Sequence, residues 1–290
     1  MVKRQKRDEF GSICGVKGSV RPRPFLKWAG GKNQLITQMT PYLPRRGSYR
    51  TYFEPMLGGG AVFFNLLPER AVLSDLNEEL INAFQIVQNK AEDLMDVLDE
   101  HDSHKMEKDY YYQVREMNPK RMSPIKSAAR TIFLNKTCFN GLYRVNSKNQ
   151  FNVPFGRYKN PKLYVRDNIL AASRSLQGKL LIHGDYMGVL EYARDGDFIY
   201  IDPPYDPLSV TSSFTGYTSG CFGNLDQEKL SEKFRELDER GCKVMLSNSS
   251  TERIKSLYSD FKIITLRAIR AINCKGEGRG RIDEVLVINY

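Results

Sequence analysis

The strongest constraint on the fold of this chain is a regular alternation of short apolar segments and helical patterns. Segments rich in β-forming residues cover 52–54, 71–74, 180–183, 198–201, 243–247, 261–266 and 285–290. Helical spacing separates most of them, as in 227–240, where Leu230, Phe234 and Leu237 repeat on one face. Such alternation predicts an α/β fold with a doubly wound, mostly parallel sheet. Only a Gly/Arg-rich loop, 275–281, separates the last two segments, which predicts a terminal antiparallel hairpin.

A long stretch between the second and third segments breaks this rhythm. From residue 77 to about 136, apolar residues repeat at helical spacing, and a polar, Asn-rich and basic stretch, NGLYRVNSKNQFNVPFGRYKNP (140–161), follows. We therefore expect residues 78–165 to form a helical insertion with a basic loop. Residues 24–77 and 166–290 would form the α/β domain. Residues 1–23 lack periodicity and would form a flexible basic arm.

The net charge of +10 is unevenly distributed along the chain. Residues 1–50 contain twelve Lys or Arg against two acidic residues, and residues 130–170 contain eight against Asp167 alone. Residues 75–109, in contrast, contain eleven acidic and three basic side chains. Basic blocks that alternate with an acidic block are typical of a face that binds a polyanion, although charge alone also fits a merely solvated surface.

Other features narrow the class of protein. No apolar run approaches the ~20 residues of a membrane helix, and no apolar signal core follows the basic first residues. The five cysteines are scattered and form no C-x-x-C pair, which indicates reduced thiols rather than disulfides or zinc ligands. His101 and His104 have the spacing of some metal ligands, but their charged neighbours favour a solvated helix face. We expect a globular cytoplasmic protein without a metal site.

The motif FEPMLGGGAVFFNL (53–66) combines an expected strand, a Gly-rich turn and the start of a helix. Glycines such as Gly58 and Gly60 allow the backbone to approach a ligand closely, and a helix start presents free N–H groups. The turn is not a P-loop, because G-x-x-x-x-G-K-[ST] is absent, and AGGK (29–32) is not one either. By itself the motif also fits a simple tight turn.

Asp75 follows the apolar segment AVLS at the end of the expected second strand. An acidic residue at this point of a nucleotide-binding half can accept hydrogen bonds from ribose hydroxyls. It can also cap the helix that begins near Asn77 and Glu78, and the two roles are compatible. Up to this point a nicotinamide-dependent enzyme explains the sequence almost as well.

The segment DFIYIDPPYDPL (197–208) separates these possibilities, because it is a strand that ends in Asp-Pro-Pro-Tyr. Pro203 and Pro204 remove backbone donors and fix φ, so the loop is stiff and its carbonyls are free to accept. The Asp202 carboxylate and the Pro203 carbonyl can accept both hydrogens of an exocyclic amine while Tyr205 stacks on the base. Accepting both hydrogens localises the amine lone pair toward an incoming methyl group, an effect that increases in a dry pocket.

These motifs resemble those of the Dam-like, D12-class adenine-N6 DNA methyltransferases, including restriction-associated members that read GATC. The similar segments are FLKWAGGK (25–32), YFEPMLGGGAVFFNL (52–66), LSDLNEELI (73–81), NGLYRVNSKNQFNVPFGRYKNP (140–161), DFIYIDPPYDPLS (197–209), SFTGYT (213–218), LSNSS (246–250) and GRIDEVLVINY (280–290). They follow the family's order from Phe25 onward, whereas residues 1–23 have no match. The resemblance implies a Rossmann-like class I methyltransferase sheet of seven strands, with an inserted helical target-recognition domain.

The resemblance also implies roles for single residues. S-adenosylmethionine would be the cofactor, bound by Trp28, Lys32, Glu54, Gly58, Gly60, Asp75 and Asp202. The catalytic set would be Asp202, Pro203, Pro204 and Tyr205. Duplex DNA would be touched by Lys27, Asn140, Leu142, Arg144, Asn146 and Pro154. In a polar loop, Arg144 suits bidentate contact to a guanine, and the adenine would leave the base stack to reach Asp202.

We expect a monomer associated with the nucleoid, and other activities remain open from the sequence. RNA adenine methylation and cytosine-N4 methylation also act on an exocyclic amine. A DNA-binding protein without catalysis is disfavoured by the intact D-P-P-Y, and a dehydrogenase by the lack of residues for hydride transfer. A restriction endonuclease as functional partner, a role in repair and a phage role are all compatible with the sequence.

Overall fold

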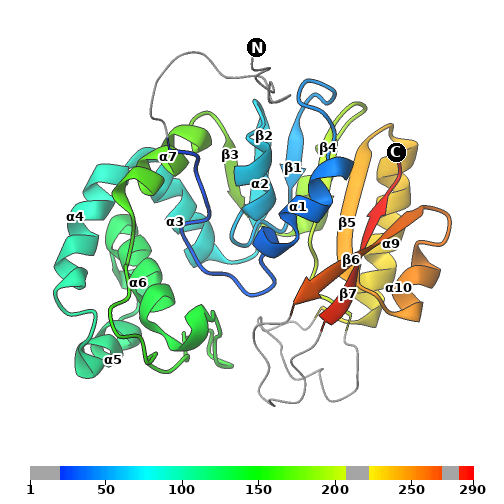
Figure 1. Ribbon diagram of the computed structural model, residues 1–290. Coiled ribbons are helices and arrows are strands. Elements are labelled where there is room, and N and C mark those ends of the chain that lie inside the picture. Colours follow the sequence, from blue (N-terminus) through cyan, green and yellow to red (C-terminus); the bar gives the residue numbers. More distant parts are fainter. Residues whose placement is uncertain (1–19, 207–221, 270–280) are drawn as a thin grey trace, which may run out of the picture.

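The computed structural model describes residues 20–206, 222–269 and 281–290 of the chain (Figure 1). Within these residues seven strands form one sheet: β1 (Tyr52–Glu54), β2 (Ala71–Asp75), β3 (Leu180–His183), β4 (Phe198–Ile201), β5 (Lys243–Ser249), β6 (Lys262–Ile269) and β7 (Arg281–Ile288). The strand order is β3-β2-β1-β4-β5-β7-β6. Strands β1 to β5 are parallel, and β7 runs antiparallel to both β5 and β6. The predicted α/β sheet with a terminal antiparallel hairpin is confirmed.

Ten α-helices and four short 3-10 helices accompany the sheet in the described ranges. The α-helices are α1 (Ile36–Met39), α2 (Ala61–Leu66), α3 (Glu78–Asn89), α4 (Ala91–Asp102), α5 (Lys108–Glu116), α6 (Pro124–Thr137), α7 (Arg166–Leu176), α8 (Tyr186–Leu190), α9 (Asn224–Glu239) and α10 (Glu252–Leu257). The 3-10 helices are η1 (Lys32–Gln34), η2 (Thr40–Tyr42), η3 (Pro119–Arg121) and η4 (Phe139–Gly141). None of the described helices is long and apolar enough to cross a membrane.

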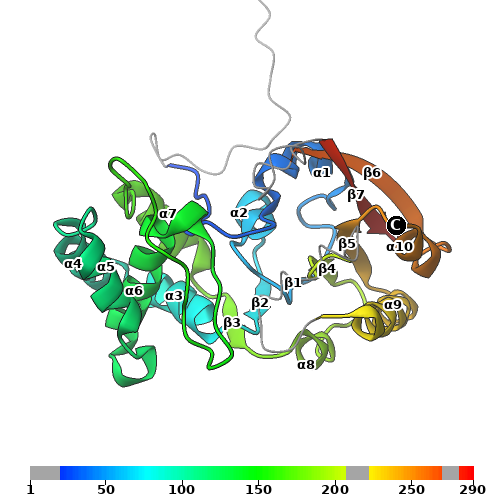
Figure 2. The same cartoon turned by 90° about the horizontal axis from the view of Figure 1, so that it is seen from below.

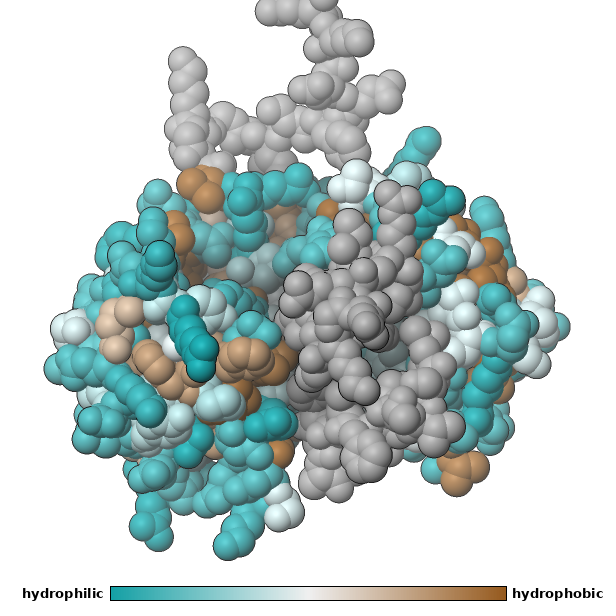
Figure 3. Space-filling view, turned by 60° about the horizontal axis from the view of Figure 1, so that its bottom comes forward, coloured by the Kyte–Doolittle hydropathy of each residue, from teal (hydrophilic) through white to brown (hydrophobic). Residues whose placement is uncertain are grey.

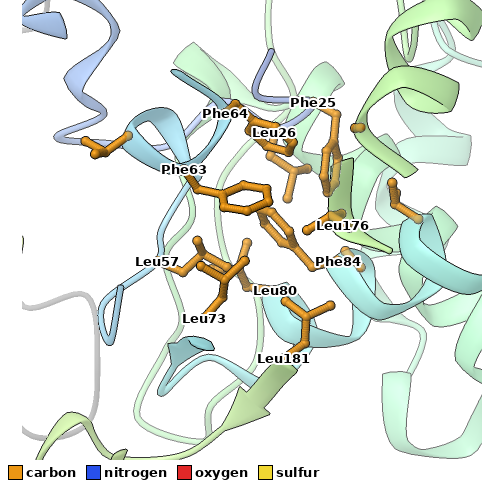
Figure 4. Packing of buried hydrophobic residues seen from close by; sticks show 14 of the residues in the cluster. Phe25, Leu26, Leu57, Phe63, Phe64, Leu73, Leu80, Phe84, Leu176 and Leu181 are labelled. Atoms are coloured by element: carbon orange, nitrogen blue, oxygen red, sulfur yellow. The ribbon is translucent and has the colours of Figure 1, made fainter. Parts of the chain in front are cut away.

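The inner strands β1, β4 and β5 are buried on both faces, and their side chains alternate between two cores. In β4, Phe198 and Tyr200 face the core shared with α2, α3 and α7, whereas Ile199 and Ile201 face the core shared with α8, α9 and α10. Figure 2 shows these two helical layers on opposite sides of the sheet. In the first core, Phe25 from the N-terminal segment packs against Phe64 and Phe84 (Figure 4).

The helices α3 to α6 fill the stretch that interrupts the strand–helix alternation, and they lie to one side of the sheet (Figure 1). Ser123 caps the start of helix α6, because its side chain accepts a hydrogen bond from Lys126 N, and Pro124 occupies the first turn. Helix α3 packs on β2 and β3 as well as on α6 and α7. It therefore joins the sheet to the helical part through one continuous core.

A third, smaller core anchors the basic loop that follows α6. It consists of Tyr111, Val114, Phe133, Leu134, Cys138, Phe151, Val153 and Leu163. Antiparallel bridges pair Cys138 with Phe155 and Val145 with Phe151, so residues 138–155 form a small hairpin. We refer to these residues as the 138–155 hairpin.

The surroundings of His101 differ from the sequence expectation. His101 does not lie on a solvated face: it is buried, its ring stacks on Phe133 and it is hydrogen-bonded to the Tyr110 hydroxyl. The expectation was wrong because His101 follows Leu94 and Leu98 on the buried face of α4. No cluster of metal-ligating side chains occurs among the described residues.

The predicted basic arm lies mostly outside the described residues, which begin at Val20. Its last residues contact the folded part: Arg21 donates to Asn65 of α2, and the Arg23 backbone exchanges two hydrogen bonds with the Asn168 side chain of α7. The SFTGYT segment (213–218) and all but Arg281 of the loop 275–281 also lie outside the described residues.

Candidate active site

A pocket lies where the strand order of the sheet reverses, between β1 and β4. At such a switch point the loops after neighbouring strands diverge and leave a crevice at the carboxyl ends of the strands. The pocket is lined by Trp28 to Lys32, Glu54, Leu57 to Val62, Tyr200 and Asp202. Three segments far apart in the sequence, including the AGGK run, therefore converge on one site.

The Gly-rich turn after β1 forms one wall of this pocket. Gly58 has a φ of 49°, and a Cβ built there would lie 2.9 Å from Cδ1 of Trp28, so both the conformation and the indole require glycine. Gly60, with a φ of 69°, is the N-cap of α2. The indole of Trp28 thus packs directly against the turn.

Glu54 is buried at the end of β1 and also lines the pocket. Its Oε2 accepts hydrogen bonds from the Tyr52 hydroxyl at 2.8 Å and from Phe63 N, in the first turn of α2, at 3.1 Å. Burial raises the pKa of Glu54 to about 8, although the Tyr52 hydrogen bond opposes the shift. The side chain therefore fixes α2 to the sheet and holds its proton more tightly than an ordinary glutamate.

Lys32 and Asp202 form an ion pair in the pocket. The Lys32 Nζ lies 2.6 Å from Asp202 Oδ2, donates to the Gly30 carbonyl and lies 4.8 Å from the centre of the Tyr205 ring. The Lys32 side chain is only 4% exposed. Burial raises the pKa of Asp202, and the adjacent Lys32 opposes that rise. The pocket thus contains the carboxyl groups of Glu54 and Asp202 and the ammonium group of Lys32.

The Asp-Pro-Pro-Tyr loop is held by residues of neighbouring elements. Gln227 of α9 donates to the Pro204 carbonyl at 3.0 Å, and Asn248 of β5 donates to Gln227 Oε1. The Tyr205 hydroxyl donates to Glu284 of β7 at 2.5 Å. The prediction of free carbonyls was therefore wrong for Pro204. No hydrogen bond among the described residues ends on the Pro203 carbonyl.

The residue after the tyrosine is fixed as well. Asn248 Oδ1 accepts from Asp206 N, Ser249 donates to the Asp206 carbonyl, and Thr251 donates to the Asp206 carboxylate. The LSNSS segment (246–250) thus supports the loop from β5. The side chains of Ser247, Asn248 and Ser249 are buried, and their hydrogen bonds with Tyr200 and with the loop satisfy their polar groups.

Asp75 holds the Gly-rich turn from outside the pocket lining. Its Oδ2 accepts from Gly58 N at 2.9 Å, and its Oδ1 accepts from Asn77 N at 2.9 Å. The N-cap of α3 is Asn77, whose side chain accepts from Leu80 N. The interpretation of Asp75 as the N-cap residue was therefore wrong, and its carboxylate instead joins the turn to the backbone of the cap residue Asn77.

The residues expected to touch DNA gather around the 138–155 hairpin. Arg144 is exposed, and its Nε donates to Asn152 Oδ1 at 2.7 Å. Lys27 comes from the N-terminal segment, and a Cβ built on Gly141 would lie 2.4 Å from its Cδ. Its Nζ donates to the Tyr158 hydroxyl.

The other members of this set have mixed surroundings. Asn140 and Pro154 are exposed, and the Pro154 carbonyl accepts from Phe139 N. Leu142 is half-buried against the hairpin core. Asn146 folds the hairpin tip, because its Oδ1 accepts from Lys148 N and Gln150 N. Figure 3 brings forward the face on which the carboxyl ends of the parallel strands lie, where hydrophilic side chains dominate and a smaller hydrophobic patch lies on the helical side.

A switch-point pocket, a Gly-rich turn and a rigid carboxylate–proline–proline–tyrosine loop together define an amino-group methyltransferase. Comparison with known proteins identifies the family. The model of the D12 class N6 adenine-specific DNA methyltransferases matches residues 28–272, and the chain belongs to this family. It is therefore an adenine-specific DNA methyltransferase.

The alignments with named relatives span almost the full length of each relative. A type II methyltransferase of Lactococcus lactis subsp. cremoris is 44% identical over 280 residues, which are 94% of this chain and 98% of the relative. A type II methyltransferase of Methanocaldococcus jannaschii is 44% identical over 286 residues, 92% of this chain and 99% of the relative. The DNA adenine methylase of Haemophilus influenzae is 34% identical over 278 residues, 94% and 96% of the two chains.

Proposed function

We propose that the enzyme transfers a methyl group from S-adenosylmethionine to N6 of an adenine within GATC in duplex DNA. The observation that carries this proposal is the placement of Asp202. Its carboxylate lies at the wall of the switch-point pocket, paired with Lys32, and the Pro203 carbonyl and the Tyr205 ring follow it in one rigid loop. Cofactor, acceptor groups and base-stacking ring would thereby share one site.

The chemistry of the pocket fits S-adenosylmethionine. Its sulfonium and amino groups are cationic, and the carboxyl groups of Glu54 and Asp202 both line the pocket. Trp28 offers an aromatic wall and Gly58 a close approach of the backbone. Trp28, Lys32, Glu54, Gly58, Gly60 and Asp202 would hold the cofactor, and Asp75 would add ribose contacts to its hold on the turn. When bound, the cofactor supplies an electrophilic methyl group.

The protein's own groups would prepare the adenine amine. Asp202 and the Pro203 carbonyl would accept its two hydrogens, and Tyr205 would stack on the ring. The partly buried setting of Asp202 strengthens such hydrogen bonds, and the adjacent Lys32 favours its ionised form. Once the nitrogen is methylated, Asp202 is placed to take the proton that the amine releases. Pro204 fixes the loop through its locked φ and its contact with Gln227.

We further propose that residues 78–165 recognise the target sequence. Lys27, Asn140, Leu142, Arg144, Asn146 and Pro154 would contact the duplex, and the adenine would flip out of the stack to reach Asp202. The monomer expected from the sequence stays a prediction. The type II methyltransferases among the relatives support a restriction endonuclease as functional partner.

The test uses tritium-labelled S-adenosylmethionine and two matched duplexes, one with GATC and one with GTTC. We expect label only in the GATC duplex, recovered as N6-methyladenine. Label in both duplexes would support the methyl-transfer reaction but contradict GATC as the target sequence. Label on cytosine or in neither duplex would contradict the proposal, and RNA substrates would then be tested.

A further inference from the structure

Tyr143 of the 138–155 hairpin stacks on Trp28 of the pocket. The ring centroids are 5.3 Å apart and the planes differ by 27°. Tyr143 is the neighbour of Arg144 in the sequence, whereas the Trp28 indole packs against Gly58 in the Gly-rich turn. One pair of rings therefore connects the hairpin with the wall of the cofactor pocket.

The hydroxyl of Tyr143 makes a second connection. It donates to Glu79 Oε1 at 3.2 Å in the first turn of α3. The other oxygen of Glu79 accepts from Arg130 at 2.9 Å and from Thr131, both in α6. Helix α3 begins just after Asp75, which holds Gly58. Both the ring and the hydroxyl of Tyr143 thus contact elements that position the Gly-rich turn.

The backbone beside Trp28 is tied to the base of the same hairpin. Asn135 of α6 accepts from Lys27 N at 2.8 Å and donates to the Lys27 carbonyl at 2.7 Å and to the Gly141 carbonyl at 3.2 Å. Lys27 and Gly141 are in direct contact. A shift of the hairpin therefore moves the segment that carries Trp28.

We propose that Tyr143 is a positioning residue that couples target-sequence binding by the hairpin to cofactor binding in the pocket. The inference rests on the proposed function, since it assigns DNA to the hairpin and S-adenosylmethionine to the pocket. When DNA fixes the hairpin, the Tyr143 ring fixes the Trp28 indole against Gly58, and the cofactor then meets a pocket wall that is already ordered. The two ligands thereby favour one arrangement of the same pair of rings, and coupling of this kind is reciprocal.

The coupling is measured as a ratio of affinities. S-adenosylhomocysteine is titrated into the full chain alone and into the chain saturated with a GATC duplex. We expect the duplex to tighten binding by about fivefold or more in the wild type. In Tyr143→Leu the ratio should fall toward one, and Tyr143→Phe should keep most of it because the ring remains. Tyr112→Leu, which removes a ring of the hairpin core that does not stack on Trp28, is the matched control and should keep the full ratio.

Trp28 supplies a second readout, because it is the single tryptophan of the chain. Binding of the GATC duplex without cofactor should change its fluorescence in the wild type, and Tyr143→Leu should reduce that change. A wild type that binds both ligands without coupling, or a folded Tyr143→Leu with the full ratio, would overturn the inference. The inference would also be overturned if binding of the GATC duplex left the Trp28 emission of the wild type unchanged. A wild type that binds neither ligand would instead refute the proposed function.

Discussion

At the scale of single residues, the ion pair of Lys32 and Asp202 decides how the acceptor role can be tested. Removing one partner of a buried pair leaves the other charge uncompensated, which costs about 3–5 kcal/mol. Asp202→Ala should therefore abolish turnover but also lower stability. Asp202→Asn keeps the shape and is the sharper change.

We expect Asp202→Asn to lower kcat by about 100-fold or more, because the amide cannot accept both a proton and the Lys32 hydrogen bond as the carboxylate does. Retention of a GATC duplex should stay near that of the wild type. Single-turnover methyl transfer and a gel-retention assay measure the two effects. The double variant Lys32→Met/Asp202→Asn should regain stability without activity. Near-normal turnover of Asp202→Asn would exclude the acceptor role.

Arg144 tests sequence reading at the same scale. Its guanidinium is exposed and already oriented by Asn152. Arg144→Ala should reduce discrimination at one base by about 1–3 kcal/mol, seen as methylation rates across GATC and its single-base variants. Lys148→Ala, at the exposed hairpin tip, is the control and should lower the methylation rates of all duplexes by the same factor. Equal loss on every duplex for Arg144→Ala would make this arginine a phosphate contact.

The sequence predicts those site residues that share a short motif with their chemistry, such as Asp202, Pro203 and Tyr205. It does not reveal partners that only the fold brings together. Glu284 holds Tyr205 across 79 positions, Gln227 holds Pro204 across 23, and Tyr143 reaches Glu79 across 64. A buried glutamine or a tyrosine beside an arginine carries no local pattern that distinguishes this role from ordinary packing.

At the scale of elements, three strands were predicted to the residue. Strands β1, β3 and β4 have the predicted bounds, because each is a short apolar run that ends where Gly, Pro or Asp follows. The pairing in the 138–155 hairpin was not predicted. Its anchors Phe151 and Val153 alternate with polar residues over too short a stretch to indicate strand structure, and the hairpin depends on the core beneath it.

Glu54 gives an element-scale prediction, because it joins β1 to the first turn of α2. With its pKa raised to about 8, the native state retains a proton that the unfolded state releases near 4.5. The native state thus binds more protons between these values, and stability falls as the pH rises through them. Glu54→Gln should flatten the fall in Tm of the cofactor-free enzyme between about pH 5.5 and 8.5. At the upper end of this range, the wild type should lose about 1–3 kcal/mol more of its free energy of unfolding than the variant.

Thermal melts across this pH range measure the effect. Glu232→Gln, which changes an exposed glutamate of α9, is the matched control and should follow the wild-type curve. An identical pH dependence for Glu54→Gln and the wild type would show that Glu54 titrates as it does in the unfolded chain.

At the scale of the whole molecule, the topology follows from the alternation of strands and helices, and the topology in turn places the site. Because the sheet order reverses between β1 and β4, the Gly-rich turn and the Asp-Pro-Pro-Tyr loop must meet at one edge. The strand–helix pattern does not predict the position of AGGK opposite them, and only the family resemblance implies that Trp28 and Lys32 lie there. This position depends on Phe25 and Leu26 entering the core between α2 and α3, which no local pattern of residues 25–32 specifies.

The charge of the whole chain leads to a final prediction, which concerns residues 1–19. They contain five Lys or Arg against Asp8 and Glu9, and none of the residues proposed for the site lies among them. Each phosphate contact contributes about 0.9 to the slope of log affinity against log salt. Deleting residues 1–19 should therefore lower the magnitude of that slope by about 1–4 and weaken the binding of GATC and GTTC duplexes by the same factor. Arg144→Ala should instead change the ratio of the two affinities. Equilibrium binding at several salt concentrations separates the two patterns. A deletion that alters the GATC to GTTC ratio at constant slope would mean that these residues read bases rather than phosphates.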